Sequence, residues 1–264
     1  MHYKAEGITN LRDLGGIRTK DGLVFKSGLL FRSGAIATSI PADSVALIRS
    51  FRLNTIVDLR DSNRVKEDPD YDFGDITYIN SPIFEIMNPE TGVNPIDIKG
   101  VENSLVGLKH SVKEYRAIVN EFLSMYRSMP FSWGFKPVFE AMDRHERVLY
   151  HCQGGKDRTG LMSIFILRAL GVSERRMIRD YLDSNKARRG RNRWRFGIIW
   201  RETHQLHAVH YMKKILLTNR KNLRVMFDAI DEKFGSFDNY LEKHFGITKE
   251  RIANWKSFYL EPIK

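Results

Sequence analysis

RVLYHCQGGKDRTGLMSIFILRAL, residues 147–170, is the stretch of the sequence that decides the fold. Its start, Arg147 to Tyr150, predicts a short strand, and the almost wholly apolar segment from Leu161 to Leu170 predicts a helix. Because that helix is apolar on nearly every side, we expect it to lie in the middle of the core. Gly171 suits the position just past its C-terminus. A strand that leads through a glycine-containing loop into a buried helix is typical of an α/β fold.

Upstream of this stretch, short apolar runs alternate with turn residues. Residues 23–25 and 29–31, separated by Lys26-Ser27-Gly28, predict a β-hairpin. Residues 55–59 predict a buried strand because they are rich in β-branched side chains, and residues 76–79 predict a third strand. The pattern then becomes helical from Glu114 to Met129, and Pro130 ends it.

Downstream, the pattern is helical to the end of the chain. Ser173 is the predicted N-cap of a helix that runs to about Arg189, and one long helix is expected around residues 205–230. A further helix covers Ser236 to Phe245 and is closed by Gly246. Strands that alternate with helices, followed by a helical tail, predict an α/β core with helical additions.

We expect one domain over residues 1–264, with 190–264 as its helical C-terminal part, because no shift in composition marks a second domain. Residues 82–110 carry several Pro, Gly and Asn residues, which predicts a long loop. The wider region 82–130 is therefore either a lid over a binding pocket or an ordinary surface connection.

The composition is that of a soluble globular protein, with 42% hydrophobic and 28% charged residues. It excludes a disordered chain, a collagen and a membrane-spanning protein. The 43 Lys and Arg residues exceed the 32 Asp and Glu residues, and the net charge of +11 favours anionic partners. One cysteine excludes an intramolecular disulfide and a multi-cysteine zinc site. The first seven residues contain no apolar segment, so we expect a cytoplasmic protein, or a secreted one whose leader was removed.

The only cysteine, Cys152, begins a loop that suits the binding of an anion. A loop that enters a helix N-terminus directs backbone N–H groups inward, and Gly154 and Gly155 let the backbone approach an oxyanion closely. Arg158 offers a planar fork that can bind two phosphate oxygens. We therefore predict that residues 153–158, which are Gln153, Gly154, Gly155, Lys156, Asp157 and Arg158, form a substrate-binding cradle.

The same surroundings predict a reactive sulfur. A helix N-terminus and nearby cations lower the pKa of a thiol, and Thr159 can donate a hydrogen bond to the sulfur. A thiolate at the base of an anion cradle can attack phosphorus and form a cysteinyl-phosphate, which water then hydrolyses. The alternative is that Cys152 is only a small buried apolar side chain, which is the common fate of a lone cysteine.

The motif HCxxGKDRTG at residues 151–160 resembles the active-site loop of the cysteine-dependent tyrosine phosphatase superfamily. It is most similar to the bacterial and fungal branch that includes a secreted mycobacterial tyrosine phosphatase and a listerial tyrosine/lipid phosphatase. Further blocks extend the resemblance from about residue 7 to 260: residues 10–16 (NLRDLGG), 31–34 (FRSG), 57–60 (VDLR), 170–172 (LGV), 180–185 (DYLDSN) and 240–241 (YL). The sequence departs from the branch after Arg60, where a glutamate is usual and this chain has Arg64 and only later Glu67.

The resemblance implies a central, mostly parallel sheet flanked by helices, and a protein-tyrosine phosphatase with Cys152 as nucleophile and Arg158 as phosphate clamp. Its substrate would be a phosphorylated protein, and its product inorganic phosphate. A phosphoinositide or dual-specificity phosphatase is the alternative, because lipid phosphatases also carry lysine and aspartate in this loop. A phosphate-dependent binding module without turnover is the alternative of another class. No cofactor and no metal ion is implied.

The general acid is left between two candidates. Asp157 lies in the loop, certain to be near the phosphate, although the cations on either side favour its carboxylate form. Asp58 ends a predicted strand, at the edge where α/β sheets bind ligands, but it could instead pair with a nearby arginine. We favour Asp157 as the residue that donates the proton or orients the attacking water.

Three other groups of residues draw attention. Arg12, Arg32 and Arg60 lie in the matched blocks, where a place near the phosphate and a structural ion pair are equally plausible readings. His204, His207 and His210 are spaced by three residues, which spreads them around a helix and argues against a metal site. The basic tract at residues 186–195 either is solvated surface or attracts acidic substrates. No nucleic-acid-binding signature accompanies it. Contact of this tract with a membrane would at most be peripheral.

Overall fold

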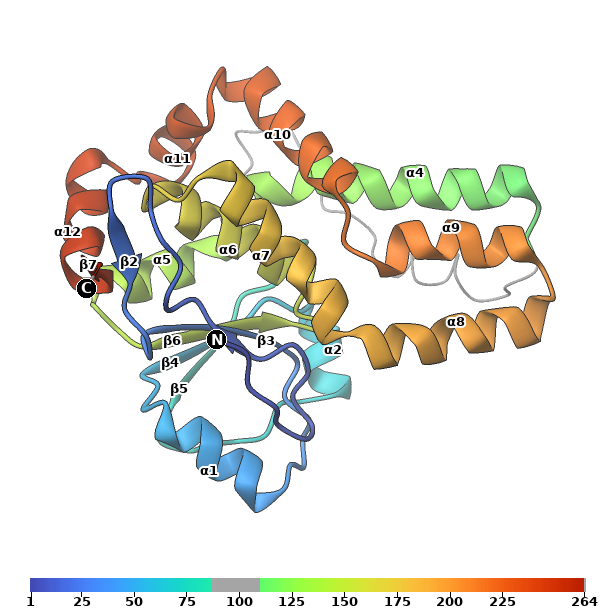
Figure 1. The fold of residues 1–264 in the computed structure, drawn as a ribbon, viewed down its shortest axis with the longest axis horizontal. Coiled ribbons are helices and arrows are strands. Elements are labelled where there is room, and N and C mark those ends of the chain that lie inside the picture. The colour runs from blue at the N-terminus through green and yellow to red at the C-terminus, as the bar shows by residue number, and fades with distance from the viewer. Residues whose placement is uncertain (87–109, 264) are drawn as a thin grey trace.

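The computed structural model describes residues 1–86 and 110–263, and its centre is a five-stranded sheet with the order β1-β3-β6-β4-β5 (Figure 1). The strands of this sheet are β1 (Arg12–Asp13), β3 (Leu30–Gly34), β4 (Thr55–Asp58), β5 (Thr77–Asn80) and β6 (Val148–Cys152). Strand β1 is antiparallel to β3, and the other neighbouring strands are parallel. The predicted α/β class with a mostly parallel sheet is therefore confirmed.

Both faces of the sheet are covered, because successive side chains on a strand point to opposite sides. One face packs on α1 (Ala42–Ser50), where Phe31, Ile56 and Leu149 of three strands form a cluster with Ile48 and Phe51. The residues next to them on each strand belong to the larger cluster on the other face. Figure 1 shows α1 below the sheet and α5, α6 and α7 above it.

Helix α6 (Arg158–Ala169) is the core element that the sequence predicts, because ten of its twelve residues are buried. Gly171 follows its end with φ +86°, a conformation that glycine adopts without strain. Neighbouring elements on this side of the sheet are α5 (Lys136–Asp143), α7 (Glu174–Ala187), α11 (Phe237–Phe245), α12 (Lys249–Tyr259) and the short 3₁₀ helices η2 (Met129–Phe131) and η3 (Trp133–Phe135).

Three helices project from the sheet side by side as an arm, on the right of Figure 1: α4 (Val112–Ser128), α8 (Arg189–Thr203) and α9 (Leu206–Leu216). Ser111 caps α4 in a reciprocal pair of hydrogen bonds with Glu114, which stabilises the start of the predicted helix. Within the region 82–130, residues 87–109 lie outside the described residues. Both interpretations of this region, a lid over the pocket and a surface connection, therefore stay predictions.

The predicted hairpin at residues 23–31 is wrong. Strand β2 (Leu23–Phe25) pairs with β7 (Leu260–Pro262) near the other end of the chain, in a separate two-stranded sheet. All five residues of β3 are buried, and β3 lies between β1 and β6. A strand that is buried on both faces belongs inside a sheet covered on both sides, so β3 cannot serve as half of an exposed hairpin.

The single helix expected at residues 205–230 is also wrong, because the chain forms α9 and then α10 (Arg220–Phe234). Between them Thr218 exchanges hydrogen bonds with the side chain of Asn185 on α7, and this pairing holds the linker in an extended form. Asn219 then caps α10 by accepting a hydrogen bond from the Asn222 backbone.

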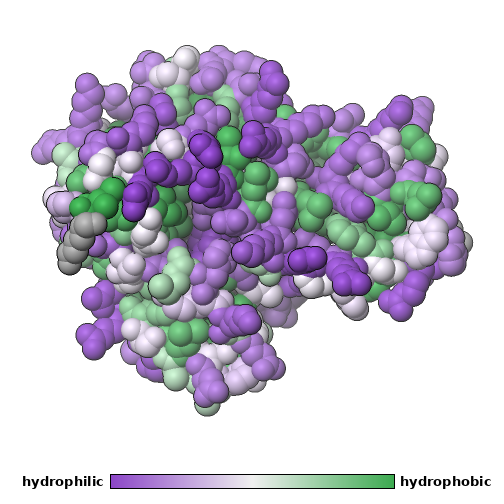
Figure 2. Space-filling model, viewed as in Figure 1, coloured by the Kyte–Doolittle hydropathy of each residue, from purple (hydrophilic) through white to green (hydrophobic). Residues whose placement is uncertain are grey.

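The surface is mostly polar in the view of Figure 2, with apolar residues exposed in small groups, some of them along the arm. Among the described residues, no helix combines the length and the apolar character needed to cross a membrane.

Candidate active site

The cysteine-containing loop leaves the sheet at the carboxyl edge of its parallel strands. Cys152 ends β6, opposite Gly34 at the end of β3, while His151 is opposite Asp58 at the end of β4. The loop then enters α6, with Asp157 as its N-cap residue. Loops at this edge of an open α/β sheet are the usual place for ligand sites.

The first three carbonyl groups of the loop point outward, and each accepts a hydrogen bond from outside the loop. The donors are the Ala35 amide to Gln153 at 3.4 Å, Arg188 Nη1 to Gly154 at 2.6 Å, and Asn10 Nδ2 and Arg32 Nη2 to Gly155 at 2.6 and 2.9 Å. Because a trans peptide places its N–H opposite its C=O, the following N–H groups, those of residues 154–156, point into the loop. The loop is thus shaped as a cradle for an anion.

Gly155 is required for this shape. Its φ is +62°, and a Cβ atom at this position would lie 2.5 Å from the backbone carbonyl of Ser33 and 2.6 Å from the Gly34 nitrogen. Any side chain would therefore push the loop away from β3.

Cys152 lies at the base of the cradle and is only 2% exposed. Burial opposes ionisation of its thiol, but the charge of Arg158 and hydrogen bonds from Thr159 outweigh burial, so the pKa of Cys152 is lowered. The Thr159 hydroxyl has no other hydrogen-bond partner among the described residues, which leaves it to the sulfur.

We expect iodoacetate to alkylate Cys152 at pH values below 7 and inorganic phosphate to protect it, because a lowered pKa extends the thiolate form to lower pH than in an ordinary cysteine. The chain has one cysteine, so the mass gain of the intact protein measures the reaction at this residue alone. A thiol that reacts only above about pH 8 would instead support the reading of Cys152 as a buried apolar side chain.

Arg158 is held at the mouth of the loop by the segment after β4. Its Nη1 lies 3.0 Å from a carboxylate oxygen of Asp61 and donates to the Leu59 carbonyl at 3.3 Å. Its guanidinium lies over the ring of Phe84, 5.8 Å from the centroid. Burial favours the neutral form of Arg158, but the negative charges of Cys152 and Asp61 outweigh it and raise its pKa. Arg158 is thus oriented, charged and beside the sulfur.

Asp157 is held by groups from the arm and from the loop itself. The Tyr126 hydroxyl of α4 donates to one carboxylate oxygen, and Lys156 Nζ lies 3.0 Å from the other. Tyr126 in turn contacts the Tyr181 hydroxyl at 2.7 Å, and Asn222 donates to Tyr181 at 3.3 Å. Burial and the charge of Asp157 raise the pKa of Tyr126 well above its ordinary value, so its hydroxyl remains a donor.

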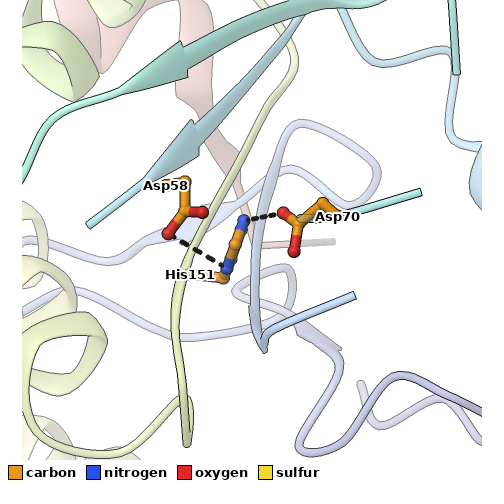
Figure 3. Close-up of side chains that lie close together, drawn as sticks. All are labelled: Asp58, Asp70 and His151. Atoms are coloured by element: carbon orange, nitrogen blue, oxygen red, sulfur yellow. Dashed lines mark ion pairs between the residues drawn. The ribbon is translucent and has the colours of Figure 1, made fainter. Parts of the chain in front are cut away.

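Asp58, the second candidate acid, is fully buried in an ion-pair network (Figure 3). Its carboxylate lies 2.7 Å from Arg60 and accepts a hydrogen bond from Tyr78 at 2.6 Å. His151 lies between Asp58 and Asp70, at 3.7 and 2.7 Å. Asp58 has no access to a leaving group here, and the pairing with an arginine is the interpretation that the structure favours.

Among residues 1–86 and 110–263, this network is the one group of carboxylate and imidazole side chains whose spacing could hold a metal ion. Arg60 binds both of its carboxylates at 2.7 Å, where a metal ion would have to bind. Burial lowers the pKa of His151, but the two carboxylates outweigh burial and raise it. The two carboxylates thus favour the charged form of the imidazole.

Arg12 and Arg32 form structural ion pairs, which was one of the two interpretations of these residues. The sequence does not reveal their partner. Both bind the Asp180 carboxylate of α7, at 3.0 and 2.6 Å. Arg32 also supports the loop through Gly155.

The predicted loop residues other than Gly155 line one cavity of about 220 Å³, together with Cys152. It is lined by Arg64, Phe84, Phe122, Met125, Met129, Cys152, Gln153, Gly154, Lys156, Asp157, Arg158, Arg188, Arg191, Arg195, Ile215 and Leu216. A larger groove of about 1180 Å³ is lined by residues of α7, α10 and α11 and contains none of the loop residues. The chemistry of Cys152 and Arg158 makes the smaller cavity the candidate active site.

The sequence does not identify Tyr126, Asp61 or Arg188 as members of this site. Tyr126 is 31 residues from Asp157 and meets it only through the packing of the arm. Asp61 could have been flagged because it directly follows the block at residues 57–60, and Arg188 belongs to the basic tract at residues 186–195 that the sequence indicates. His207, one of the three spaced histidines, contacts the His110 carbonyl at 3.2 Å and faces the ring of Tyr115.

Comparison with known proteins gives concordant results. Residues 3–261 match the tyrosine phosphatase family. A Cupriavidus necator protein named as a tyrosine-protein phosphatase is 29% identical over 140 residues, 52% of this chain and 49% of that protein. The chain thus spans about half the length of this curated relative.

Two solved structures show a weaker similarity to the chain. A cysteine-to-serine variant of P. aeruginosa TpbA in complex with phosphotyrosine is 18% identical, with a TM-score of 0.31 over 61% of this chain and 71% of that one. Tk-PTP in its active form is 13% identical, with a TM-score of 0.28 over 71% of this chain and 90% of that one. Because the family match extends over nearly the whole sequence, the chain belongs to the tyrosine phosphatase family.

Proposed function

We propose that this protein hydrolyses phosphomonoesters, above all phosphotyrosine in proteins, through a cysteinyl-phosphate intermediate. The observation that carries the proposal is the anion cradle at residues 152–158, with a thiol of lowered pKa at its base and Arg158 beside it. Membership of the family supports the same activity.

In the first step, the Cys152 thiolate attacks phosphorus, so that a P–S bond forms while the bond from phosphorus to the phenolic oxygen breaks. Arg158 and the inward N–H groups bind the three equatorial oxygens, where negative charge accumulates. Asp157 donates its proton to the leaving oxygen.

In the second step, a water molecule attacks phosphorus and gives a proton to Asp157, the P–S bond breaks, and inorganic phosphate leaves. Tyr126 and Lys156 hold the Asp157 carboxylate in place to accept that proton. The hydrogen bond from Thr159 stabilises Cys152 as the leaving thiolate. No step uses a cofactor.

The cavity wall favours an aromatic ester. Phe84, Phe122 and Met125 line it together with other apolar side chains, and such a surface suits the ring of phosphotyrosine. Lys156 and the arginines that also line the cavity make a phosphoinositide the second candidate substrate, since its headgroup carries several negative charges.

The function is tested by measuring hydrolysis of a phosphotyrosine peptide beside a panel of phosphoinositides, with a chelator present. We expect turnover of the peptide, unaffected by the chelator. A clear preference for the lipids would replace the proposed substrate class. Binding of both without phosphate release would identify a binding module, and loss of all activity in chelator would overturn the metal-free mechanism.

The role of Asp157 predicts how activity depends on the leaving group. Asp157→Asn should lower kcat/KM for phenyl phosphate by about 10²-fold or more, but kcat/KM for an ester of an activated nitrophenol much less, because kcat/KM reports the first step and a good leaving group needs no proton there. Rates measured over a series of substituted phenyl phosphates give this dependence.

Two further variants serve as comparisons. Tyr126→Phe removes one contact to Asp157 and should shift the pH profile of kcat while keeping a milder dependence on the leaving group. Asp58→Asn should lower stability, since it disrupts a buried ion-pair network, and leave the leaving-group dependence as in the wild type. A steep dependence in Asp58→Asn and none in Asp157→Asn would reverse the two roles.

A further inference from the structure

The cavity above Cys152 has more positive charge than one phosphate requires. Among the residues that line it, Asp157 is the one carboxylate, whereas six are arginine or lysine: Arg64, Lys156, Arg158, Arg188, Arg191 and Arg195. Lys156 is engaged by Asp157 and donates to the Ile215 carbonyl at 2.6 Å. In the proposed reaction, Arg158 and the loop N–H groups already bind the reacting phosphate. The remaining arginines therefore face a part of the substrate beyond that phosphate.

Arg188 is a buried guanidinium at the edge of the loop, with 5% of its surface exposed. Its Nη1 donates to the Gly154 carbonyl at 2.6 Å, while its Nε has no hydrogen-bond partner among the described residues. A buried donor without an acceptor destabilises the fold unless a ligand supplies one. The side chain lies against Gly154, where an added Cβ atom would come within 2.6 Å of Nη1. An anion next to the reacting phosphate would thus lie within reach of this group.

Arg191 extends the same row away from the loop. Arg188 directly precedes α8, and Arg191 follows three positions later on the same face of the helix. Arg191 is exposed, and in the described part of the chain it forms no ion pair with a carboxylate. Arg193 has the same charge and is equally solvent-exposed on α8, but it does not line the cavity. The helix therefore offers a natural pair for comparison.

We propose that Arg188 and Arg191 form a second anion subsite, which binds an acidic side chain next to the phosphotyrosine of a peptide substrate. The proposal deepens the proposed function and rests on it. A peptide can contact both kinds of lining residue, because its phenyl ring packs on the apolar side chains while a neighbouring carboxylate reaches the arginines. An inositol ring would instead place its hydroxyl groups against Phe84 and Phe122, where they lose hydrogen bonds to water.

The test uses two phosphotyrosine peptides that differ at one position, with glutamate or glutamine directly after the phosphotyrosine. Their affinities are measured by calorimetry for Cys152→Ser, which cannot turn them over. We expect the glutamate peptide to bind about tenfold more tightly, as a charge-assisted contact to a guanidinium provides. Adding Arg191→Gln should bring the ratio of affinities close to one, and adding Arg193→Gln should keep it.

The other outcomes overturn the proposal. If the glutamate and glutamine peptides bind Cys152→Ser with nearly equal affinity while the arginines are intact, the second anion subsite does not exist. An equal fall in Arg191→Gln and Arg193→Gln would mean that only the overall charge of α8 matters. If Arg191→Gln weakens the binding of a short-chain phosphatidylinositol bisphosphate and leaves the ratio of the two peptide affinities unchanged, Arg188 and Arg191 bind a lipid headgroup instead. Because binding is measured without turnover, absence of hydrolysis in the wild type would overturn the proposed function separately.

Discussion

Replacing Cys152 by serine is expected to lower hydrolysis of a phosphotyrosine peptide by a factor on the order of 10⁴ or more. A serine hydroxyl is not ionised near pH 7, so the attack on phosphorus is lost. Binding of inorganic phosphate should be nearly unchanged, since the cradle consists of backbone N–H groups and Arg158. Steady-state kinetics and phosphate titration by calorimetry measure the two effects on the same preparation.

The thermal unfolding midpoint of Cys152→Ser is the control, because it shows whether the buried loop remains folded. Substantial hydrolysis by a folded Cys152→Ser protein would remove Cys152 from the nucleophile's role. Loss of both hydrolysis and phosphate binding in a folded variant would mean that the sulfur shapes the cradle itself.

Replacing Arg158 by lysine is expected to lower kcat/KM for aryl phosphates by about 10²–10³-fold. Lysine keeps the charge, but its single ammonium group cannot bind two phosphate oxygens in the plane of a guanidinium. It also loses the geometry by which Arg158 contacts Asp61 and the Leu59 carbonyl together. The variant should therefore bind phosphate more weakly and also turn over more slowly.

Arg168→Lys is the matched control for this experiment. Arg168 lies near the other end of α6 and pairs with the exposed Asp238 at 3.1 Å, a contact that contributes little to stability. It should have kinetics close to the wild type. Near-normal activity in Arg158→Lys would show that the guanidinium at this position does not bind the substrate.

The sequence predicts the centre of the fold well, because the strand, loop and helix from residue 147 to 170 are contiguous. Their order, together with the strands at 55–59 and 76–79, is a local pattern that needs no knowledge of distant contacts. The pairing of β2 with β7 is different, since it joins residues more than 200 positions apart. The apolar runs at residues 23–31 have the pattern of a hairpin, and only the sheet's other strands decide against it.

The candidate site divides in the same way. The residues that belong to the loop, such as Cys152 and Arg158, can be named from the sequence because the loop itself brings them together. The groups that orient them come from elsewhere: Tyr126 from α4, Arg188 from the start of α8 and Asp61 from the segment after β4. No spacing in the sequence indicates these contacts, because they depend on how the helices pack.

Asp58 illustrates why a strand end alone does not identify a catalytic acid. Its position at the carboxyl edge of β4 suggests a ligand site, but the residues around it, Arg60, Tyr78 and His151, use its carboxylate fully. Burial raises the pKa of a carboxyl group, yet His151 and Arg60 outweigh burial and lower the pKa of Asp58. It therefore stays ionised, which suits a structural ion pair and not a proton donor.

The covalent intermediate is the central claim, and trapping it tests that claim most directly. The wild type and Asp157→Asn are mixed with an activated aryl phosphate, quenched in acid within the first turnover, digested and examined by mass spectrometry. Asp157→Asn should accumulate the intermediate because its second step is slowed. We predict a phosphoryl group on the peptide that contains Cys152, absent from Cys152→Ser. Release of the phenol with no phosphoryl group on Cys152 at any quench time, in either protein, would contradict the account.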